Sequence, residues 1–98
     1  MIAEFEGEVF RWEARSEAWF FAAVPEALSR DIREIPRMPR GFGAVRVFAR
    51  IGGSSWRTSI FPSGETGGYI LPLKRSIREA ESVRDGATVH VHLEVLDA

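Results

Sequence analysis

Three cationic side chains fall within five residues of one another in the last third of the chain: Lys74, Arg75 and Arg78. They occupy the first half of a predicted short helix over residues 74–83, where the helix dipole favours anions and disfavours cations. Lys74 and Arg78 also stand four residues apart, and like charges at that spacing cost a helix roughly 0.2–0.5 kcal/mol. A phosphate, sulfate or carboxylate bound at the helix start relieves both conflicts. We therefore predict a weak anion site here; the alternative is that Glu79, Glu81 or another carboxylate pairs with these cations in solvent.

The three tryptophans are the second group that can contact a ligand. Aromatic side chains dominate the cores of small domains, so the pattern favours core positions for Trp12, Trp19 and Trp56. Trp56 differs from the other two because it follows the Gly52-Gly53 turn, where the end of a strand can be open. We predict that Trp56 forms a wall of the anion site if this hairpin folds over the same rim.

His90 and His92 lie two residues apart on one predicted strand face, with Glu94 next in line. His-x-His is a metal-ligand spacing, but a metal needs three or four ligands and one strand supplies only part of them. A solvated polar face is the favoured interpretation. We expect the terminal strands to be neighbours, with Glu6 or Glu8 near a histidine, which would raise the pKa of that histidine.

The catalytic signatures that a sequence can carry are missing. There is no cysteine and no Gly-x-Ser-x-Gly elbow, both histidines occupy one strand, and the glycines match no phosphate-binding pattern. We therefore expect a protein that is not an enzyme and that uses no cofactor and no metal.

These side chains must be positioned by strands. Residues 4–13 alternate between glutamates and apolar side chains after Glu4, and residues 44–51 alternate again. The last strand is the clearest, with apolar side chains at every second position from Ala87 to Val95. Residues 18–24 are apolar on both faces and predict a central strand that is covered on both sides. The full set of predicted strands is 4–13, 18–24, 44–51, 54–61, 69–73 and 87–95.

Two short helices accompany the strands. Pro25 suits a first helical position, and Leu28, Ile32 and Ile35 then form one apolar stripe before Pro36 ends the helix. In the second helix, residues 74–83, we expect Ile77, Ala80 and Val83 to face inward. Six strands and two helices predict a mainly β domain, namely an antiparallel barrel or tightly curved sheet with helical caps.

Composition limits the setting and the partners. The chain has 98 residues, which fits one domain, residues 1–98, and its net charge is −1. Nucleic-acid binders normally carry a basic excess, so we predict no strong nucleic-acid binding. No signal peptide or membrane span is recognisable, and the absence of cysteine fits a reducing cytoplasm, so we expect a cytoplasmic protein that does not bind a membrane.

Several pieces of the chain together carry a family resemblance. They are Trp19 and Leu28 with Pro25 between them, and the segments 43–47, 51–60, 68–74, 77–80 and 85–89. In this order they resemble the DUF1905 family, a bacterial family of domains of unknown function that fold as small double-split β-barrels. The resemblance implies that fold and about six strands, but no activity, cofactor or catalytic residue. Related domains occur alone or fused to a module linked to bacteriocin resistance, and the same architecture occurs in dimeric regulators and antitoxins that bind DNA.

The sequence therefore predicts a non-enzymatic binding or interaction module. Its candidate ligand-binding residues are Lys74, Arg75, Arg78 and Trp56, and its partner is a small anionic ligand or a protein, with a homo-oligomer left open. The first alternative is an accessory nucleic-acid-binding domain that uses the arginines at positions 30, 33, 37, 40, 46, 50 and 57. The second is an enzyme with an unrecognised pocket, which requires a deep pocket with convergent polar groups.

Overall fold

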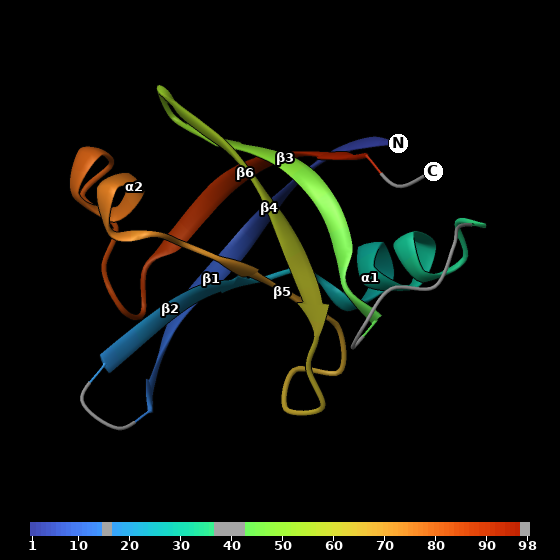
Figure 1. Ribbon diagram of the computed structural model, residues 1–98, viewed down its shortest axis with the longest axis horizontal. Helices are drawn as coiled ribbons and strands as arrows, with labels where there is room; N and C mark the ends of the chain where they lie inside the picture. The colour runs from blue at the N-terminus through green and yellow to red at the C-terminus, as the bar shows by residue number, and fades with distance from the viewer. Residues whose placement is uncertain (15–16, 37–42, 97–98) are drawn as a thin grey trace.

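The computed structural model describes residues 1–14, 17–36 and 43–96. Six strands and two helices follow one another along the chain (Figure 1). The strands are β1 (Ile2–Ala14), β2 (Glu17–Ala23), β3 (Val45–Ile51), β4 (Ser54–Pro62), β5 (Tyr69–Pro72) and β6 (Thr88–Val95). The helices are α1 (Glu26–Arg33) and α2 (Arg75–Ala80). The mainly β fold class is confirmed, and no helix among the described residues is long and apolar enough to cross a membrane.

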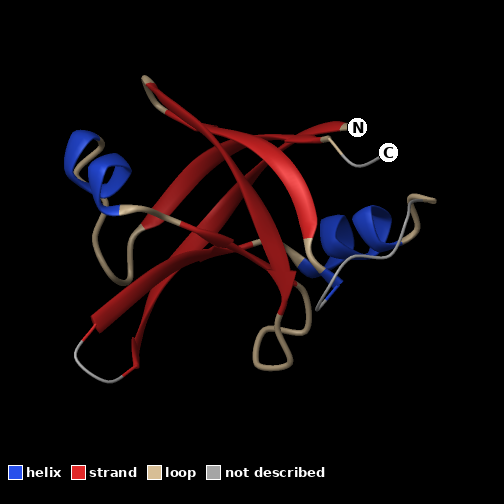
Figure 2. Cartoon of the chain, viewed as in Figure 1, coloured by secondary structure: helices blue, strands red, loops and turns tan. Residues whose placement is uncertain are grey.

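The strands close into an antiparallel barrel in the order β1-β2-β5-β4-β3-β6 (Figure 2). β1 is long enough to serve both sides of the barrel. Its first half pairs with β6, from Ile2↔Glu94 to Glu8↔Thr88, and its second half pairs with β2, from Val9↔Ala22 to Ala14↔Glu17. The predicted adjacency of the terminal strands is confirmed. The Gly52-Gly53 turn joins β3 to β4 as expected, with Gly52 at φ +58°.

Alternate side chains of the strands fill the barrel. Val45, Val47, Val91 and Leu93 are almost completely buried, as their period-two spacing predicts. Val89 lies on the same inner face at 9% exposure. The core extends to both helices, because Ile32 of α1 and Ile77 of α2 are buried in the same cluster.

Helix α1 packs against the barrel through Ser29 and Ile32. Pro25 is the N-cap residue, so the helix begins at Glu26, one residue later than predicted. Ser29 is fully buried, and its Oγ accepts a hydrogen bond from the Tyr69 N–H (3.0 Å) and donates one to the Val24 carbonyl (3.3 Å). This hydroxyl therefore joins α1 to both β5 and the end of β2.

Helix α2 is shorter than the predicted 74–83. It spans Arg75–Ala80, and Lys74 is its N-cap residue in extended conformation. Ile77 and Val83 are buried as expected, but Ala80 is exposed, so that part of the prediction is wrong. The chain leaves the helix at Glu81, and Ser82 adopts φ +53°, so Val83 reaches the core from a turn instead of from a helical face.

The seam between β4 and β5 is the weakest part of the barrel wall. Only two residue pairs join these strands, Phe61↔Ile70 and Pro62↔Tyr69. Along its other edge β4 pairs with β3 from Ser54 to Ile60, and over this stretch it has no paired residue in β5. On the other side, β5 pairs with β2 over three residues, from Phe21↔Pro72 to Ala23↔Ile70, after which the Leu73 N–H donates to the Phe20 carbonyl. Residues 17–19 of β2 extend beyond this ladder.

That extension corrects the prediction that residues 18–24 are covered on both faces. Trp19 is 51% exposed and lies opposite Trp12, which is 38% exposed. Trp12 contacts Phe21 and Phe10 through edge-to-face rings, whereas Trp56 is 6% exposed and belongs to the core. The core assignment is right for Trp56 and wrong for Trp12 and Trp19, because the β1–β2 hairpin projects past the strands that would cover it (Figure 1).

Candidate ligand-binding site

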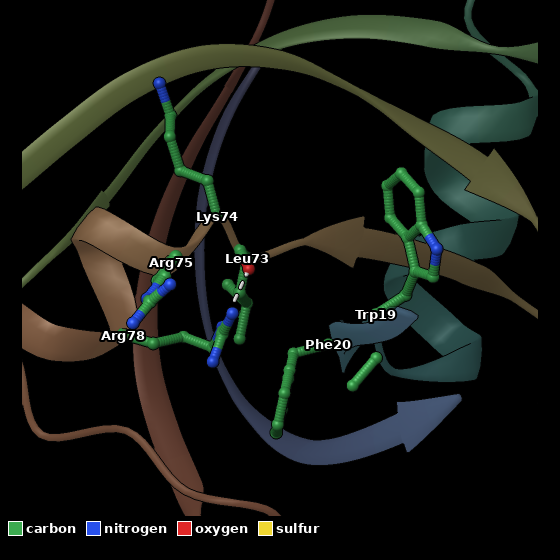
Figure 3. Close-up of a pocket in the computed structure, with 7 residues that line it drawn as sticks. Trp19, Phe20, Leu73, Lys74, Arg75 and Arg78 are labelled. Carbon is green, nitrogen blue, oxygen red and sulfur yellow. Dashed lines mark hydrogen bonds between the residues drawn. The ribbon is translucent and has the colours of Figure 1, made fainter. Parts of the chain in front are cut away.

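A hollow of about 480 Å³ lies where β2 extends past β5 and the chain enters α2. Its lining residues are Ala18, Trp19, Phe20, Leu73, Lys74, Arg75 and Arg78. The three cations predicted from the sequence therefore lie around one hollow (Figure 3). In this view the Lys74 and Trp19 side chains extend in the same direction, toward β4, and Phe20 extends the opposite way.

Arg78 builds the wall of this hollow. Its Nε donates a hydrogen bond to the Leu73 carbonyl (3.2 Å), and its guanidinium carbon lies 4.0 Å from the centre of the Phe20 ring. The guanidinium is thus held in place by a carbonyl and a ring face, two contacts that leave its positive charge uncompensated. Arg78 fixes α2 against β2 and adds positive potential to the hollow.

Arg75 and Lys74 differ in how they are partnered. Arg75 Nε lies 3.0 Å from Glu79 Oε2 in an exposed i, i+4 pair, so the solvated pairing considered from the sequence is found for this residue. Exposed pairs of this kind contribute only about 0.3–0.5 kcal/mol, so a competing anion can displace Glu79. The Lys74 carbonyl accepts hydrogen bonds from the Ile77 and Arg78 N–H groups, but its side-chain ammonium makes no hydrogen bond or ion pair with the described residues.

The sequence analysis missed Phe20, and it favoured a core position for Trp19, which lines the hollow instead. The signal that could have identified Trp19 is its position close to the start of a strand, since the end of a strand can have few neighbours to cover it. Trp56 does not line this hollow. It lines a smaller adjoining one together with Trp19 and Lys74, so it does lie against the same rim, although its own side chain is mostly buried.

The hollow combines a half-exposed indole, a guanidinium above a ring, and further cations. No carboxylate side chain lines it among the described residues. Glu79 pairs with Arg75 from outside the hollow, whereas no ion pair joins Lys74 or Arg78 to a described carboxylate, so the local potential is positive even though the whole chain has a net charge of −1. The arrangement can hold an anionic group at Lys74 and Arg75 while a flat apolar group lies on Trp19.

A second polar cluster lies on the outer face of β1 and β6. His90 Nε2 is 2.8 Å from Glu4 Oε1, and His90 Nδ1 is 2.9 Å from Glu6 Oε1. Hydrogen bonds from Glu4 and then Glu6 raise the pKa of His90, and the bond to His90 lowers the pKa of Glu4. The expected approach of Glu6 to a histidine is confirmed, whereas Glu8 lies opposite Thr88. Both ring nitrogens of His90 are engaged, and the described residues form no group of three or more ligands that could hold a metal ion.

The arginines considered for nucleic-acid binding divide between two regions. Arg30 and Arg33 lie on α1, and Arg33 contacts the Tyr69 ring. Arg46 and Arg50 alternate with buried residues on β3, and Arg57 pairs across from Phe48 on β4. Arg37 and Arg40 lie outside the described residues. Of the five arginines that the structure describes, three lie on the neighbouring strands β3 and β4 and two lie on α1.

Comparison with known proteins identifies one family. The sequence model of the domain of unknown function DUF1905 matches residues 5–93, which covers all six strands and both helices in whole or in large part. No curated protein sequence gives a significant match to the chain.

Proposed function

The chain belongs to the DUF1905 family, whose description assigns no activity, and from its geometry we propose that it is a binding module for a small planar organic anion. The ligand lies in the hollow between β2 and the start of α2. One observation carries the proposal: the half-exposed Trp19 side chain borders the same hollow as Lys74, which has no partner among the described residues.

Each part of the hollow has a function in this proposal. The indole of Trp19 offers a ring face, and stacking of a base on an aromatic side chain contributes about 1–3 kcal/mol. Lys74 and Arg75 supply charge-assisted hydrogen bonds to the anionic group, and such bonds are roughly twice as strong as neutral ones. Arg78 is already fixed by Leu73 and Phe20, so little side-chain entropy is lost when the ligand arrives.

The proposal is binding rather than catalysis. The lining supplies cations and ring faces, which suit an anion and its ring, and its described residues include no carboxylate or histidine to act as a general base. Nucleic acid is a less suitable ligand for this site, because none of the described arginines on α1, β3 and β4 lines the hollow. Arg57 lines only the smaller hollow that adjoins it.

Adenosine 5′-monophosphate is a suitable probe because it joins a planar base to a phosphate. We expect it to bind more tightly than adenosine or inorganic phosphate alone in isothermal titration calorimetry. Trp19→Ala is expected to weaken binding about tenfold, by loss of the stacking surface. Lys74→Ala is expected to weaken it severalfold and to reduce its dependence on salt concentration.

Trp12→Ala and Arg84→Ala are the matched controls. Trp12 is the other exposed tryptophan of the same hairpin, and Arg84 is an exposed cation; neither lines the hollow. Both variants are expected to bind the probe like the parent. 1-Naphthoate in place of the nucleotide shows whether the site accepts a carboxylate as well as a phosphate. Equal loss in Trp19→Ala and Trp12→Ala, or no binding of either probe by the parent protein, would contradict the proposal.

A further inference from the structure

A second hollow, of about 280 Å³, adjoins the first on the side of β4. Its lining residues are Trp19, Phe20, Trp56, Arg57, Thr58, Pro72, Leu73 and Lys74. Four of these also line the first hollow, namely Trp19, Phe20, Leu73 and Lys74. The two hollows therefore form one groove with a shared middle, and Lys74 stands at that middle.

The second hollow lies beside the short β4–β5 ladder. β4 is paired with β5 only at Phe61 and Pro62, so its segment around Trp56 and Thr58 has no β5 partner. Thr58 pairs with Val47 of β3 and is half-buried, and Trp56 closes the bottom of the hollow with its mostly buried ring. Trp56, Arg57 and Thr58 of this stretch line the second hollow.

The charges of the second hollow also favour an anion. Arg57 is exposed, and its guanidinium, like the Lys74 ammonium, makes no hydrogen bond or ion pair with the described residues. The Thr58 hydroxyl can donate a further hydrogen bond. No carboxylate lines the second hollow among the described residues, so the two unpaired cations Lys74 and Arg57 stand at the middle and at one end of the groove.

We propose that Arg57 and Thr58 form a second anion subsite, and that the natural ligand is an aromatic compound with two consecutive phosphate groups, of the nucleoside diphosphate class. This inference rests on the proposed function. The ring stacks on Trp19, the first phosphate lies at Lys74 and Arg75, and the second extends from Lys74 toward Arg57. Lys74 contacts both phosphates because it lines both hollows. A guanidinium binds a phosphate through paired N–H donors, which gives the second subsite its specificity.

The test compares the affinities of adenosine 5′-diphosphate and adenosine 5′-monophosphate, without divalent cations, in the parent protein and in two variants. We expect the parent to bind the diphosphate about fivefold to tenfold more tightly. In Arg57→Ala the ratio of the two affinities is expected to fall to about one, while the affinity for the monophosphate changes less than twofold. Arg84→Ala removes an equal charge outside the groove, and it is expected to keep the parental ratio. Unfolding midpoints in urea establish that each variant is folded.

Equal affinities for the two nucleotides in the parent, or a parental ratio retained in Arg57→Ala, would overturn the second subsite and leave the proposed function intact. Inorganic pyrophosphate tests whether the second subsite can stand when the proposed function fails. If the monophosphate does not bind but pyrophosphate binds and loses its affinity in Arg57→Ala, the proposed function fails and the phosphate subsite stands. If the parent binds neither nucleotide nor pyrophosphate, both claims fail.

Discussion

Arg78 shows why the type of a residue does not determine its function. From the sequence it is one of three equivalent cations, yet only Arg78 makes contacts that join α2 to β2. Arg75 is paired along its own helix, and Lys74 is unpaired among the described residues. The three side chains therefore have three functions: Arg78 supports the groove, Arg75 is available after it leaves Glu79, and Lys74 is the free cation.

Arg78→Ala is expected to lower the free energy of unfolding by about 1–3 kcal/mol, because it removes a hydrogen bond from a charged donor and a cation–π contact. Arg75→Ala, which removes only an exposed pair on the same helix, is expected to cost less than about 0.5 kcal/mol. Urea denaturation followed by tryptophan fluorescence measures both. Equal effects of the two substitutions would show that Arg78 does not support the groove.

His90 gives a prediction on pH. Its pKa is raised above 6.5 by Glu4 and Glu6, and the pKa of Glu4 is lowered below 4.5 by His90. The contribution of His90 to stability is therefore fully present below pH 6.5 and is lost as the pH rises through the folded-state pKa. The contribution of Glu4 is present above pH 4.5 and is lost as the pH falls through its own folded-state pKa. The cluster stabilises the protein most between these two limits.

We expect NMR titration of the histidine ring protons to give a pKa for His90 above 6.5, and we expect Glu4→Gln to lower it. The bonded carboxylates are exposed, so the effect on stability is small and salt reduces it. A His90 pKa at or below 6.5 in the parent protein would contradict the hydrogen bonds described for Glu4 and Glu6.

At the scale of elements, strand periodicity predicted most strands of the barrel but did not predict the two hollows on its surface. The alternation of Val45–Ile51 and Thr88–Val95 predicts both strands and their buried faces, because one residue type recurs at every second position. The hollows depend on which strands pair and on how many residues each ladder contains. The two-residue β4–β5 ladder and the extension of β2 past β5 result from tertiary pairing, and no local pattern specifies them. For this reason Trp19 was assigned to the core and Arg57 was considered only as one arginine among seven.

Helix α2 shows the same limit. The sequence predicted one helix over residues 74–83 with Ile77, Ala80 and Val83 facing inward, and of these three only Ile77 and Val83 are buried. In the structure the helix ends at Ala80, and the Ser54 hydroxyl donates to Glu81 (2.7 Å), which joins the end of α2 to the β3–β4 hairpin. This contact joins residues 27 positions apart, so no local pattern in the sequence indicates it.

Helix α1 is joined to the barrel by the Ser29 hydroxyl. Ser29→Ala is expected to cost about 1–3 kcal/mol of unfolding free energy, because it leaves the buried Tyr69 N–H and Val24 carbonyl without this partner. Ser76→Ala, at an exposed position of α2, is expected to change stability by less than about 0.5 kcal/mol. A cost below about 0.5 kcal/mol for Ser29→Ala, measured by urea denaturation, would show that the apolar contacts of Ile32 alone hold the helix.

At the scale of the whole molecule, net charge proved to be a poor guide to the local site. A chain with a net charge of −1 separates its charges: Glu4, Glu6 and Glu8 line the outer face of β1, whereas Lys74, Arg75 and Arg78 surround the groove. The barrel architecture, the terminal-strand pairing and the clustering of these three cations were all predictable from the sequence. The groove itself was not predictable, because its walls come from β2, β4, β5 and the start of α2, and no local pattern gives the relative positions of these elements.

The most direct test of the account is to locate a bound planar anion by NMR. With adenosine 5′-monophosphate added, we predict intermolecular nuclear Overhauser effects between the adenine protons and the indole ring of Trp19, together with shifts of the amide signals of Leu73, Lys74 and Arg75. The amides of the Gly52-Gly53 turn and of the outer face of β6 are expected to be unaffected. Overhauser effects to Trp12 in place of Trp19, or shifts centred on β6 and β1 with none at Leu73–Arg75, would contradict the assignment of the groove as the ligand-binding site.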